Sequence, residues 1–500
     1  MSDALDITDS ELAAVGIPRS EVERQLALFR NPPAYAHLIR SCSVGDGIEL
    51  LEDEAACLAA YERARAGGRL SKFVPASGAA SRMFQALLAV RPLASTRSEL
   101  EELLRQGNMA AQIALEFLDG VAGLPFVDDL RSHFRARGDD LDRVLADDSL
   151  TAIVEALVGD RGIGLASLPK GLIPFHRYPD GALSAFEEHL YEAVELVRDD
   201  AGRVRLHFTI SEEHAPLFQA KLLETRMAIE GDGSTKLLVG FSTQQRSTDT
   251  VSVDLANRPF RDAAGRVVFR PGGHGALLEN LNQSGADIAL VQNIDNIQPA
   301  RCRPQSLRWK KLLIGRLVRL QEIVAAALRG EDVSVADRAV LARLSPLASN
   351  GGVARALDRP LRVCGVVRNT GEPGGGPFWL RGGDGRETKQ IVEGAQVDPD
   401  DAEQQAVYAG ASHFNPALIA CGLRNRDGVP FDLNDFVDPR AVLISRKSLE
   451  GRDLKALERP GLWNGSMAHW LTVFAEVDQA TFTPVKTVVD LLRPEHQVDS

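Results

Sequence analysis

The sequence lacks several features that would assign it to common classes of protein. No run approaches 18 apolar residues, so we expect no membrane-spanning helix. The first six residues lack the basic-then-apolar order of a signal peptide, so we expect no secretion. The five cysteines are scattered, and no pair of them has the spacing of metal ligands. We therefore expect reduced, buried thiols in a cytoplasmic protein.

Basic residues are also fewer than acidic residues. Lys and Arg number 57 against 69 Asp and Glu, which gives a formal net charge of −12. This balance argues against a general nucleic-acid binder and against a polybasic membrane anchor, but it allows a local basic pocket for phosphates. The sequence has no Walker loop, no G-x-G-x-x-G turn, no Ser-His-Asp order and no hexapeptide repeat.

The length and the pattern of apolar residues predict an α/β protein of several parts. Five hundred residues exceed what one simple core accommodates, so two or three structural units are expected. Predicted strands alternate with helices between residues 71 and 298, which is typical of a mostly parallel sheet. We divide the chain into a helical region at 1–68, an α/β core at 69–325 with a helical insertion at about 97–160, and an α+β region at 326–500.

A loop of small residues follows the first predicted strand of the core, 71–75. It consists of Ala76, Ser77, Gly78, Ala79, Ala80, Ser81 and Arg82, and a predicted helix begins at Met83. Free backbone N–H groups before a helix favour phosphate, and the Arg82 guanidinium could add a charge-assisted hydrogen bond. Alternatively, the small residues serve only the packing of a tight turn.

Two further segments place one charged side chain each beside a turn. Lys170 lies between Pro169 and Gly171, where it is either a point charge for a phosphate or a solvent-exposed loop lysine. Asp295 follows the apolar strand predicted at 288–294. A carboxylate that leaves a buried strand can hold Mg²⁺, or it can form an Asx turn.

A glycine-dense turn precedes that strand. Gly272, Gly273, His274 and Gly275 allow backbone to approach a ligand, and His274 could bind a base, a ribose or a phosphate. Its imidazole could equally satisfy loop carbonyls. Glu372 and Glu393 flank a Gly/Pro-rich segment and are candidate partners of a sugar hydroxyl or a metal, or else solvated surface carboxylates.

Three of these motifs, in this order, resemble one family. Pro271–Gly275 is similar to the Pro-Pro-Gly-His-Gly turn of the UDP-sugar pyrophosphorylases, and Asn293–Asn296 to their Asn-Ile-Asp-Asn strand end. Phe482–Leu492 resembles their late Pro-Val-Lys-Thr-x-x-Asp-Leu-Leu motif. The loop 75–82 and the segment 169–174 are similar to pieces of sugar nucleotidyltransferases more widely. As a whole the chain resembles a bacterial family allied to these enzymes.

The resemblance implies a GT-A-like, Rossmann-related nucleotidyltransferase core. Such enzymes join a sugar 1-phosphate to a nucleoside triphosphate, UTP-like here, with Mg²⁺, and release pyrophosphate. By motif position Gly78–Arg82 would cradle the triphosphate, and the Gly272–Gly275 turn would contact the nucleoside. Asp295 would bind Mg²⁺, and Lys486 would neutralise phosphates with help from Lys170 and Arg82. Apart from the resemblance, we predict Asn293, Glu372 and Glu393 as substrate contacts.

Two other functions fit the same motifs. A glycosyltransferase that consumes a nucleotide sugar uses the same core. A non-catalytic nucleotide or nucleotide-sugar binder is favoured by the first loop, which has fewer glycines than the Gly-Gly-x-Gly-Thr-x-Leu of relatives. Neither nucleic acid nor membrane is expected as a partner. We expect the loop 76–82, the turn at His274, Asp295 and Lys486 to converge on one phosphate-bearing site.

Overall fold

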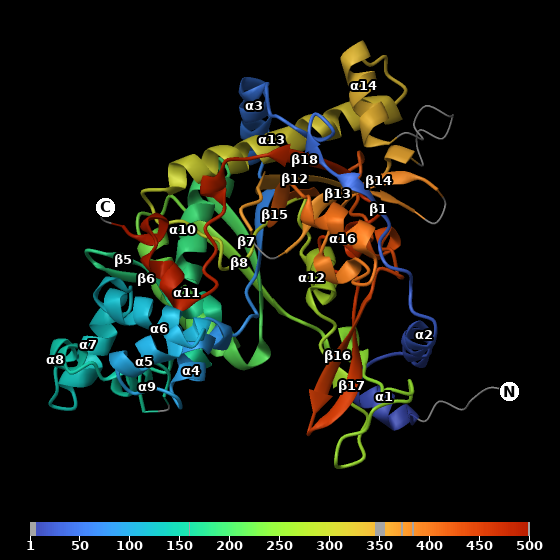
Figure 1. The fold of residues 1–500 in the computed structure, drawn as a ribbon. Helices are drawn as coiled ribbons and strands as arrows, with labels where there is room; N and C mark the ends of the chain where they lie inside the picture. Colours follow the sequence, from blue (N-terminus) through green and yellow to red (C-terminus); the bar gives the residue numbers. More distant parts are fainter. Residues whose placement is uncertain (1–6, 160, 346–355, 372–373, 383–384, 499–500) are drawn as a thin grey trace. The chain divides into compact units, whose positions relative to one another are not determined.

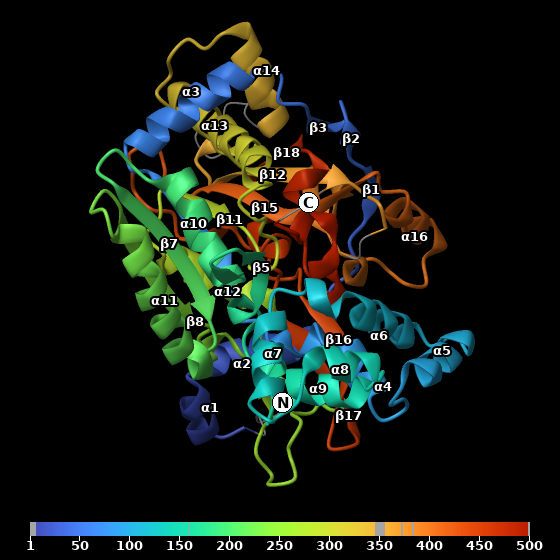
Figure 2. The same cartoon turned by 90° about the vertical axis from the view of Figure 1, so that its left-hand side faces the viewer.

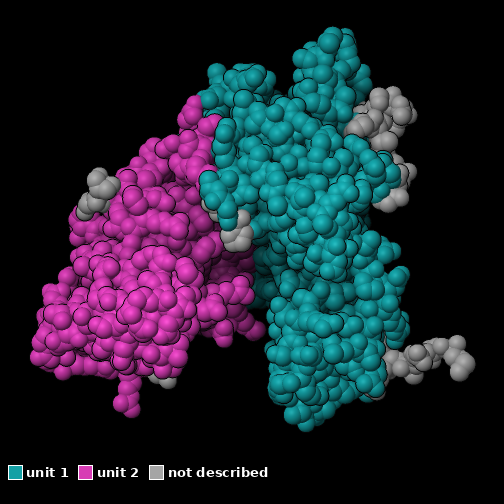
Figure 3. Space-filling model, viewed as in Figure 1, with its two compact units in different colours: residues 1–73, 242–291, 311–477 teal, residues 74–241, 292–310, 478–500 magenta. Residues whose placement is uncertain are grey.

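A computed structural model describes residues 7–159, 161–345, 356–371, 374–382 and 385–498. The chain groups into two compact units, coloured in Figure 3. Unit 1 comprises residues 1–73, 242–291 and 311–477, and unit 2 comprises residues 74–241, 292–310 and 478–500. Both are discontinuous in sequence. Their limits differ from the three regions predicted at 1–68, 69–325 and 326–500, whose independence as domains stays a prediction.

Unit 1 is built on a mixed sheet with the strand order β2-β3-β18-β12-β15-β11-β4. These strands are β2 (Ser43–Val44), β3 (Gly47–Glu49), β18 (Leu471–Glu476), β12 (Leu361–Arg368), β15 (His413–Gly422), β11 (Ile288–Val291) and β4 (Leu70–Pro75). All neighbours are parallel except β15, which is antiparallel to both β11 and β12. The carboxyl ends of β4 and β11 therefore meet at one edge of the sheet.

Smaller strand pairs and several helices complete unit 1. The strands are β1 (Leu38–Ser41), β9 (Thr250–Val251), β10 (Phe269–Arg270), β13 (Gly376–Arg381), β14 (Glu387–Val392), β16 (Leu443–Leu449) and β17 (Arg452–Glu458). The helices are α1 (Asp9–Val15), α2 (Arg19–Arg30), α3 (Glu54–Ala66), α12 (Leu277–Gln283), α14 (Val335–Leu344), α16 (Ala402–Ala409) and most of α13 (Arg303–Leu328).

Helices α3 and α13 lie side by side in both views (Figures 1 and 2). A Cβ added at Gly315 of α13 would stand 1.8 Å from the carbonyl oxygen of Cys57 in α3, so only glycine permits this close approach. Ion pairs such as Arg63–Glu322, at 2.9 Å, flank the contact. The two helices are therefore held by backbone proximity first and by exposed charges second.

The prediction that residues 1–68 are all helical is wrong between Leu38 and Glu49. This stretch forms β1, β2 and β3, and α3 begins only at Glu54. Strand β1 pairs with β13, and β3 pairs with β18, so each finds its partner more than 300 residues later in the chain. Such pairing is set by tertiary contacts, which local periodicity does not reveal.

Unit 2 contains the end of β4, two long strands and most of the short helices. Its strand order is β4-β7-β8, with β7 at Arg203–Ile210 and β8 at Lys236–Thr243, and β5 (Pro174–Tyr178) pairs with β6 (Gly181–Ser184). The helices are α4 (Gln85–Val90), α5 (Arg97–Arg105), α6 (Met109–Gly120), α7 (Val127–Arg135), α8 (Leu141–Ala146), α9 (Leu150–Val158), α10 (Ala185–Val197) and α11 (Ala215–Glu230).

Aromatic side chains join α10 and α11 to β7 in the core of unit 2. Figure 2 shows α10 against β7 with α11 beside it. The Phe186 ring of α10 lies 4.7 Å from that of Phe208 in β7 and 5.3 Å from that of Phe218 in α11, measured between centroids. All three are fully buried, which fixes these helices on the sheet.

Among the described residues, no single helix is long and apolar enough to cross a membrane. In the part of the chain that was described, one bent pair, Met109–Gly123 and Val127–Arg135, which meet at 83°, reaches the required length and composition when counted together.

The fold class predicted from the sequence is confirmed. The chain is α/β, with a large mixed and mostly parallel sheet, helices near the amino terminus and a strand-rich carboxyl-terminal region. The predicted strands at 71–75 and 288–294 correspond to β4 and β11, the second of which ends earlier, at Val291, and β7 and β8 lie within the predicted alternation of strands and helices between 71 and 298.

Candidate functional site

The loop after β4 offers unpaired backbone donors to solvent. Ala76 is buried, and its N–H donates to the Thr209 carbonyl at 2.8 Å, which anchors the loop to β7. Ser77, Gly78 and Ala79 are exposed, and within the described residues their N–H groups donate no hydrogen bond. A Cβ at Gly78 would meet nothing within 4 Å. The loop therefore presents free N–H groups to an open space, as an anion site requires.

The second half of the loop forms a single 3₁₀ turn, Ala80–Arg82, and α4 begins at Gln85, two residues after the predicted start at Met83. Ala80 is buried, and its N–H donates to the Leu168 carbonyl at 3.1 Å. Ser81 and Arg82 are exposed. No carboxylate pairs with the Arg82 guanidinium within the described ranges, so its charge remains available to a ligand.

Lys170 is brought to this loop by backbone pairing. Its N–H donates to the Gly78 carbonyl at 3.0 Å, and Pro169 forms a β-bridge with Ala79. Its side chain then reaches Asp295, with Nζ 2.7 Å from Oδ2. Two segments that were singled out separately from the sequence therefore meet at one ion pair.

Lys486 approaches the same carboxylate from the end of the chain. Its Nζ lies 3.8 Å from Asp295 Oδ2, and the N–H of the preceding Val485 donates to the Asp295 carbonyl at 3.1 Å. The side chains of Lys170 and Asp295 are each 14% exposed, whereas that of Lys486 is 59% exposed. Two ammonium groups against one carboxylate leave a net positive charge, which suits an anionic ligand.

The protonation state of Asp295 follows from its surroundings. Burial would raise the pKa of its carboxyl, but the charges of Lys170 and then Lys486 outweigh this effect and hold the pKa below its usual value. Asp295 is therefore ionised at neutral pH. It orients both lysines while one of their charges stays uncompensated.

A ladder of buried amide and hydroxyl side chains holds Asp295 beside Lys486. Asn296 Nδ2 donates to the Thr481 carbonyl at 3.0 Å, and its Oδ1 accepts from the Thr483 N–H at 2.9 Å. Gln298 Nε2 donates to Thr483 Oγ1 at 2.9 Å. These hydrogen bonds fix the segments 292–298 and 481–486 relative to each other, and with them the positions of Asp295 and Lys486.

The ladder rests on a buried ion pair that the sequence analysis missed. Lys310 Nζ donates to Glu192 of α10 and lies 3.4 Å from Gln298 Oε1, which also accepts from Ser306 at 2.9 Å. Lys310 and Glu192 are both fully buried. A lysine among the apolar residues of α13 was the available signal, because such a residue needs a carboxylate partner.

The fit of these residues to Mg²⁺ depends on a single carboxylate. No group of three or more His, Cys, Asp or Glu side chains suited to a metal exists in the described part of the chain. Asp295 alone provides a carboxylate in the cluster. Mg²⁺ often uses one or two protein carboxylates, with phosphates and waters as its other ligands, so Asp295 fits an ion that arrives with a phosphate ligand.

The glycine-dense turn lies in unit 1, where packing explains its glycines. A Cβ at Gly272 would stand 2.5 Å from the Thr248 carbonyl, one at Gly273 2.8 Å from Glu458 Oε2, and one at Gly275 2.1 Å from the Pro460 carbonyl. Gly273 also has φ 72°, a region that favours glycine. The predicted contact of this turn with a nucleoside stays a prediction.

His274 is a neutral imidazole that packs against the ring of Trp463. Its Nδ1 accepts from the Leu462 N–H at 3.2 Å, which assigns its proton to Nε2, 3.7 Å from Glu393 Oε1. Its ring centroid lies 4.4 Å from that of Trp463, whose Nε1 donates to the same Glu393 oxygen at 3.0 Å. Burial lowers the pKa of His274 despite the neighbouring carboxylates.

The remaining predicted residues are placed as follows. Asn293 is partly buried, and its carbonyl accepts from the Asn296 N–H at 3.1 Å. Glu372 lies outside the described residues. The structure brings together the loop 76–82, Lys170, Asp295 and Lys486 within unit 2, and His274 with Glu393 within unit 1. Convergence of these two groups stays a prediction.

A family model matches the chain over residues 6–350 and 330–497, and its description reads "Domain of unknown function (DUF4301)". The chain belongs to this family. No curated protein matches the sequence of this DUF4301 member.

Solved structures with a similar fold share little sequence with the chain. The uridine diphosphate N-acetylglucosamine pyrophosphorylase from Trypanosoma brucei, solved with an inhibitor, has a TM-score of 0.50 at 14% identity, over 97% of this chain and 79% of that one. A UDP-glucose phosphorylase from Trypanosoma brucei has a TM-score of 0.47 at 14% identity, over 97% and 76%. The first likeness shows a UDP-sugar pyrophosphorylase-like fold, and it confirms the predicted resemblance at the level of fold.

Proposed function

We propose that this DUF4301 protein is a nucleotidyltransferase that joins a sugar 1-phosphate to a nucleoside triphosphate, UTP-like, and releases pyrophosphate. The observation that carries the proposal is the cluster of Lys170, Asp295 and Lys486 beside the open N–H groups of residues 77–79. Nucleotidyl transfer needs positioned phosphates and neutralised charge more than an acid–base pair. This cluster offers both, and its net charge is positive.

Each residue has a defined task in this proposal. The N–H groups of residues 77–79 and the Arg82 guanidinium bind the outer phosphates of the triphosphate. A phosphate oxygen of the sugar 1-phosphate attacks the α-phosphorus, and the bond from that phosphorus to the β-phosphate oxygen breaks. Lys170 and Lys486 neutralise the negative charge on the phosphates during this exchange. Pyrophosphate leaves with the bonding electron pair, so no proton needs to be transferred.

Magnesium fits this proposal as an ion that enters with the triphosphate. Asp295 would supply its one protein carboxylate, and the ion would add neutralising charge to the phosphates. The chain's own contribution is to keep Asp295 ionised and to hold two lysines around it.

Release of pyrophosphate tests the proposal. The purified protein is incubated with Mg²⁺, each of the common nucleoside triphosphates and a panel of sugar 1-phosphates, and pyrophosphate is measured with a coupled assay. We expect release with at least one pairing. Lys486→Met and Asp295→Asn should lower kcat by about 100-fold or more, the scale of losing one charge-stabilising group. Lys236→Met, an exposed lysine at the start of β8, is the matched control and should retain activity.

Three results would overturn the proposal. Failure to release pyrophosphate with every pairing is the first. Hydrolysis or transfer from a nucleotide sugar, without pyrophosphate formation, would instead identify a glycosyltransferase. Calorimetric binding of a nucleotide with no turnover would identify a non-catalytic binder.

A further inference from the structure

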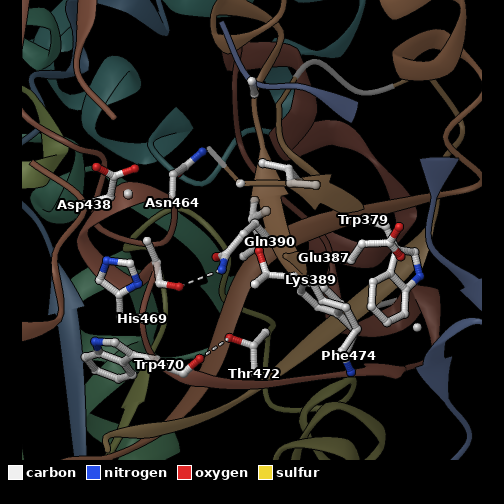
Figure 4. Close-up of a pocket in the computed structure, with 18 of the residues that line it drawn as sticks. Trp379, Glu387, Lys389, Gln390, Asp438, Asn464, His469, Trp470, Thr472 and Phe474 are labelled. Atoms are coloured by element: carbon white, nitrogen blue, oxygen red, sulfur yellow. Dashed lines mark hydrogen bonds between the residues drawn. The ribbon is translucent and has the colours of Figure 1, made fainter. Parts of the chain in front are cut away.

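Unit 1 contains a groove of about 2650 Å³ that none of the residues singled out from the sequence lines. Its walls include strands β13, β14 and β18 and the segment 464–474. Figure 4 shows Gln390 in the middle of the view, with Asn464 and Trp470 to one side and Lys389 and Trp379 to the other. The groove mixes aromatic, charged and amide side chains, so its chemistry can be assessed group by group.

Lys389 of β14 places an unpaired ammonium in this groove. It is partly buried, and no carboxylate oxygen of the described residues lies within ion-pair distance of its Nζ. It stands opposite Trp379 in the β13–β14 register, with Nζ 5.9 Å from the indole centroid. Burial lowers its pKa. A half-desolvated lysine without an anion is costly, which makes an anionic ligand favourable here.

A second cation without a carboxylate lies behind the wall of the groove. Arg362 of β12 is fully buried, and its guanidinium donates to Thr472 Oγ1 at 2.9 Å, Gln390 Oε1 at 3.0 Å and the Trp463 carbonyl at 2.6 Å. All three acceptors are neutral. Thr472 and Gln390 line the groove, so the uncompensated charge of Arg362 lies one side chain away from it.

Seven carboxylates line the groove, and three of them are paired with arginines. Asp46 pairs with Arg40 at 2.6 Å, and Glu49 pairs with Arg316 at 2.6 Å.

Glu387 pairs with Arg381 at 3.3 Å. Each of the three carboxylates is thus matched by an arginine of its own. Lys389 and Arg362 form no ion pair with these three carboxylates, so their positive charges would attract an anion that bound beside Lys389.

Two buried polar atoms of residues that line the groove also lack partners. Trp470 Nε1 and Asn464 Oδ1 make no hydrogen bond among the described residues, and both side chains belong to residues only 5% exposed. Both residues line the groove. An unpaired buried donor and an unpaired buried acceptor each cost about 1–3 kcal/mol, so the groove has a place for a ligand that carries hydroxyl groups.

We infer that this groove binds a small phosphate ester of a polyol, with the phosphate against Lys389 and the hydroxyl groups toward Trp470 and Asn464. The site is separate from the proposed catalytic cluster, because every residue that lines it belongs to unit 1. It gives the protein a second anion-binding site. Phosphate is the shared chemistry of the ester and of free inorganic phosphate, and the test distinguishes them.

The experiment uses the full chain with Lys170→Met and Lys486→Met, which removes the lysine charges of the catalytic cluster. Glycerol 3-phosphate, inorganic phosphate and glycerol are titrated separately by calorimetry, at an ionic strength held constant with sodium chloride. We expect glycerol 3-phosphate to bind, inorganic phosphate to bind more weakly, and glycerol alone to give no signal. The melting temperature should rise with glycerol 3-phosphate, because the ligand binds the native state.

Lys389→Gln in that background should weaken binding about tenfold, the scale of one charge-assisted hydrogen bond. Lys389→Arg should preserve it. Lys447→Gln, an exposed lysine of β16, is the control and should change nothing. Circular dichroism verifies the folding of each variant.

Failure of glycerol 3-phosphate to bind the background protein, or equal binding by Lys389→Gln, would overturn the inference. Pyrophosphate release by the single variant Lys389→Gln should stay normal, so this test and that of the proposed function fail independently.

Discussion

Asp295 is a carboxylate whose role is set by two lysines. A lone aspartate after a buried strand is compatible with a turn or with a metal ligand, and the sequence leaves both open. Lys170 Nζ lies 2.7 Å from the Asp295 carboxylate and Lys486 Nζ lies 3.8 Å from it. These contacts indicate that Asp295 is ionised and that it positions both ammonium groups. A phosphate would then bind the lysines that Asp295 has placed.

Replacing Lys170 by Met should lower the free energy of unfolding, because it leaves the Asp295 carboxylate buried without its nearest cation. Without Lys170, burial dominates and the pKa of Asp295 rises above its unfolded value. Stability at pH 7 should then fall by about 3 kcal/mol, as for other broken buried pairs, and the deficit should shrink as the pH falls and Asp295 becomes protonated. Urea denaturation at pH 7 and pH 5 measures this. Asp295→Asn in the same chain should recover most of the loss, and failure to do so would contradict the assigned pairing.

His496 should make stability sensitive to mild acid. Burial, and then the neighbouring His176, lower the pKa of His496 to about 3, and its Nδ1 lies 3.0 Å from His176 Nε2. Because the folded pKa lies below the unfolded value of about 6.5, the unfolded state binds the extra proton between these values. This contribution to stability is present at neutral pH and is lost as the pH falls below about 6.5, by about 2 kcal/mol at pH 5. His496→Gln should flatten that slope in urea denaturation, and identical slopes would contradict it.

At the scale of elements, the segments 292–298 and 481–486 act as one piece. Their hydrogen bonds run through Asn296 and Gln298, and Gln298 is tied to the buried pair of Lys310 and Glu192. The distance between Asp295 and Lys486 is therefore fixed by groups that touch neither charge. These are positioning residues for the proposed reaction.

Asn296→Ala should lower kcat by about 10- to 100-fold with little change in KM, because a shift of about an ångström in the Asp295–Lys486 spacing affects transition-state charge most. Steady-state kinetics of pyrophosphate release measure the split. Gln479→Ala, an exposed amide on the same carboxyl-terminal segment, is the matched control. If the two variants lose activity equally, or if only KM changes for Asn296→Ala, the ladder does not position the reaction.

Elements differ in how well the sequence predicts them. Strands β4, β7, β8 and β11 are apolar and bounded by turn residues, so their positions could be predicted from local pattern. Strands β1 and β3 could not, because their stability depends on β13 and β18, far along the chain. The buried Lys310–Glu192 pair was missed for the same reason. Neither residue shows its partner in the sequence.

At the scale of the whole molecule, the buried thiols report on the core of unit 1. Cys42, Cys57, Cys364 and Cys421 are buried, and Cys302 alone is partly exposed. Burial raises the pKa of Cys42 to about 12 and that of Cys364 to about 11, so these thiols remain protonated and unreactive.

Iodoacetamide at pH 8 should therefore modify no more than one thiol of the native protein, at Cys302, and all five after denaturation. Mass spectrometry of the intact chain counts the adducts. Cys302→Ser should leave the native protein unlabelled. Rapid labelling of Cys364 or Cys421 in the native state would show that the core of unit 1 is not packed as described.

The candidate site was predicted in its parts and not in its geometry. Short motifs identified the loop 76–82, Lys170, Asp295 and Lys486. The resemblance to the UDP-sugar pyrophosphorylases then implied that they belong to one site. Their meeting in unit 2 depends on β4 lying parallel to β11 and on the pairing of 292–298 with 481–486, which only a folded chain shows. The ion pair between Lys170 and Asp295 was not predicted, because Lys170 was considered either as a phosphate ligand or as a solvent-exposed lysine.

The proposed reaction is tested by pyrophosphate release from the intact protein and from Lys486→Met. We predict release that requires a nucleoside triphosphate, a sugar 1-phosphate and Mg²⁺ together, and a fall of about 100-fold in Lys486→Met while Lys236→Met remains active. Release that is unchanged in Lys486→Met, or the lack of release with every base and sugar, would contradict it.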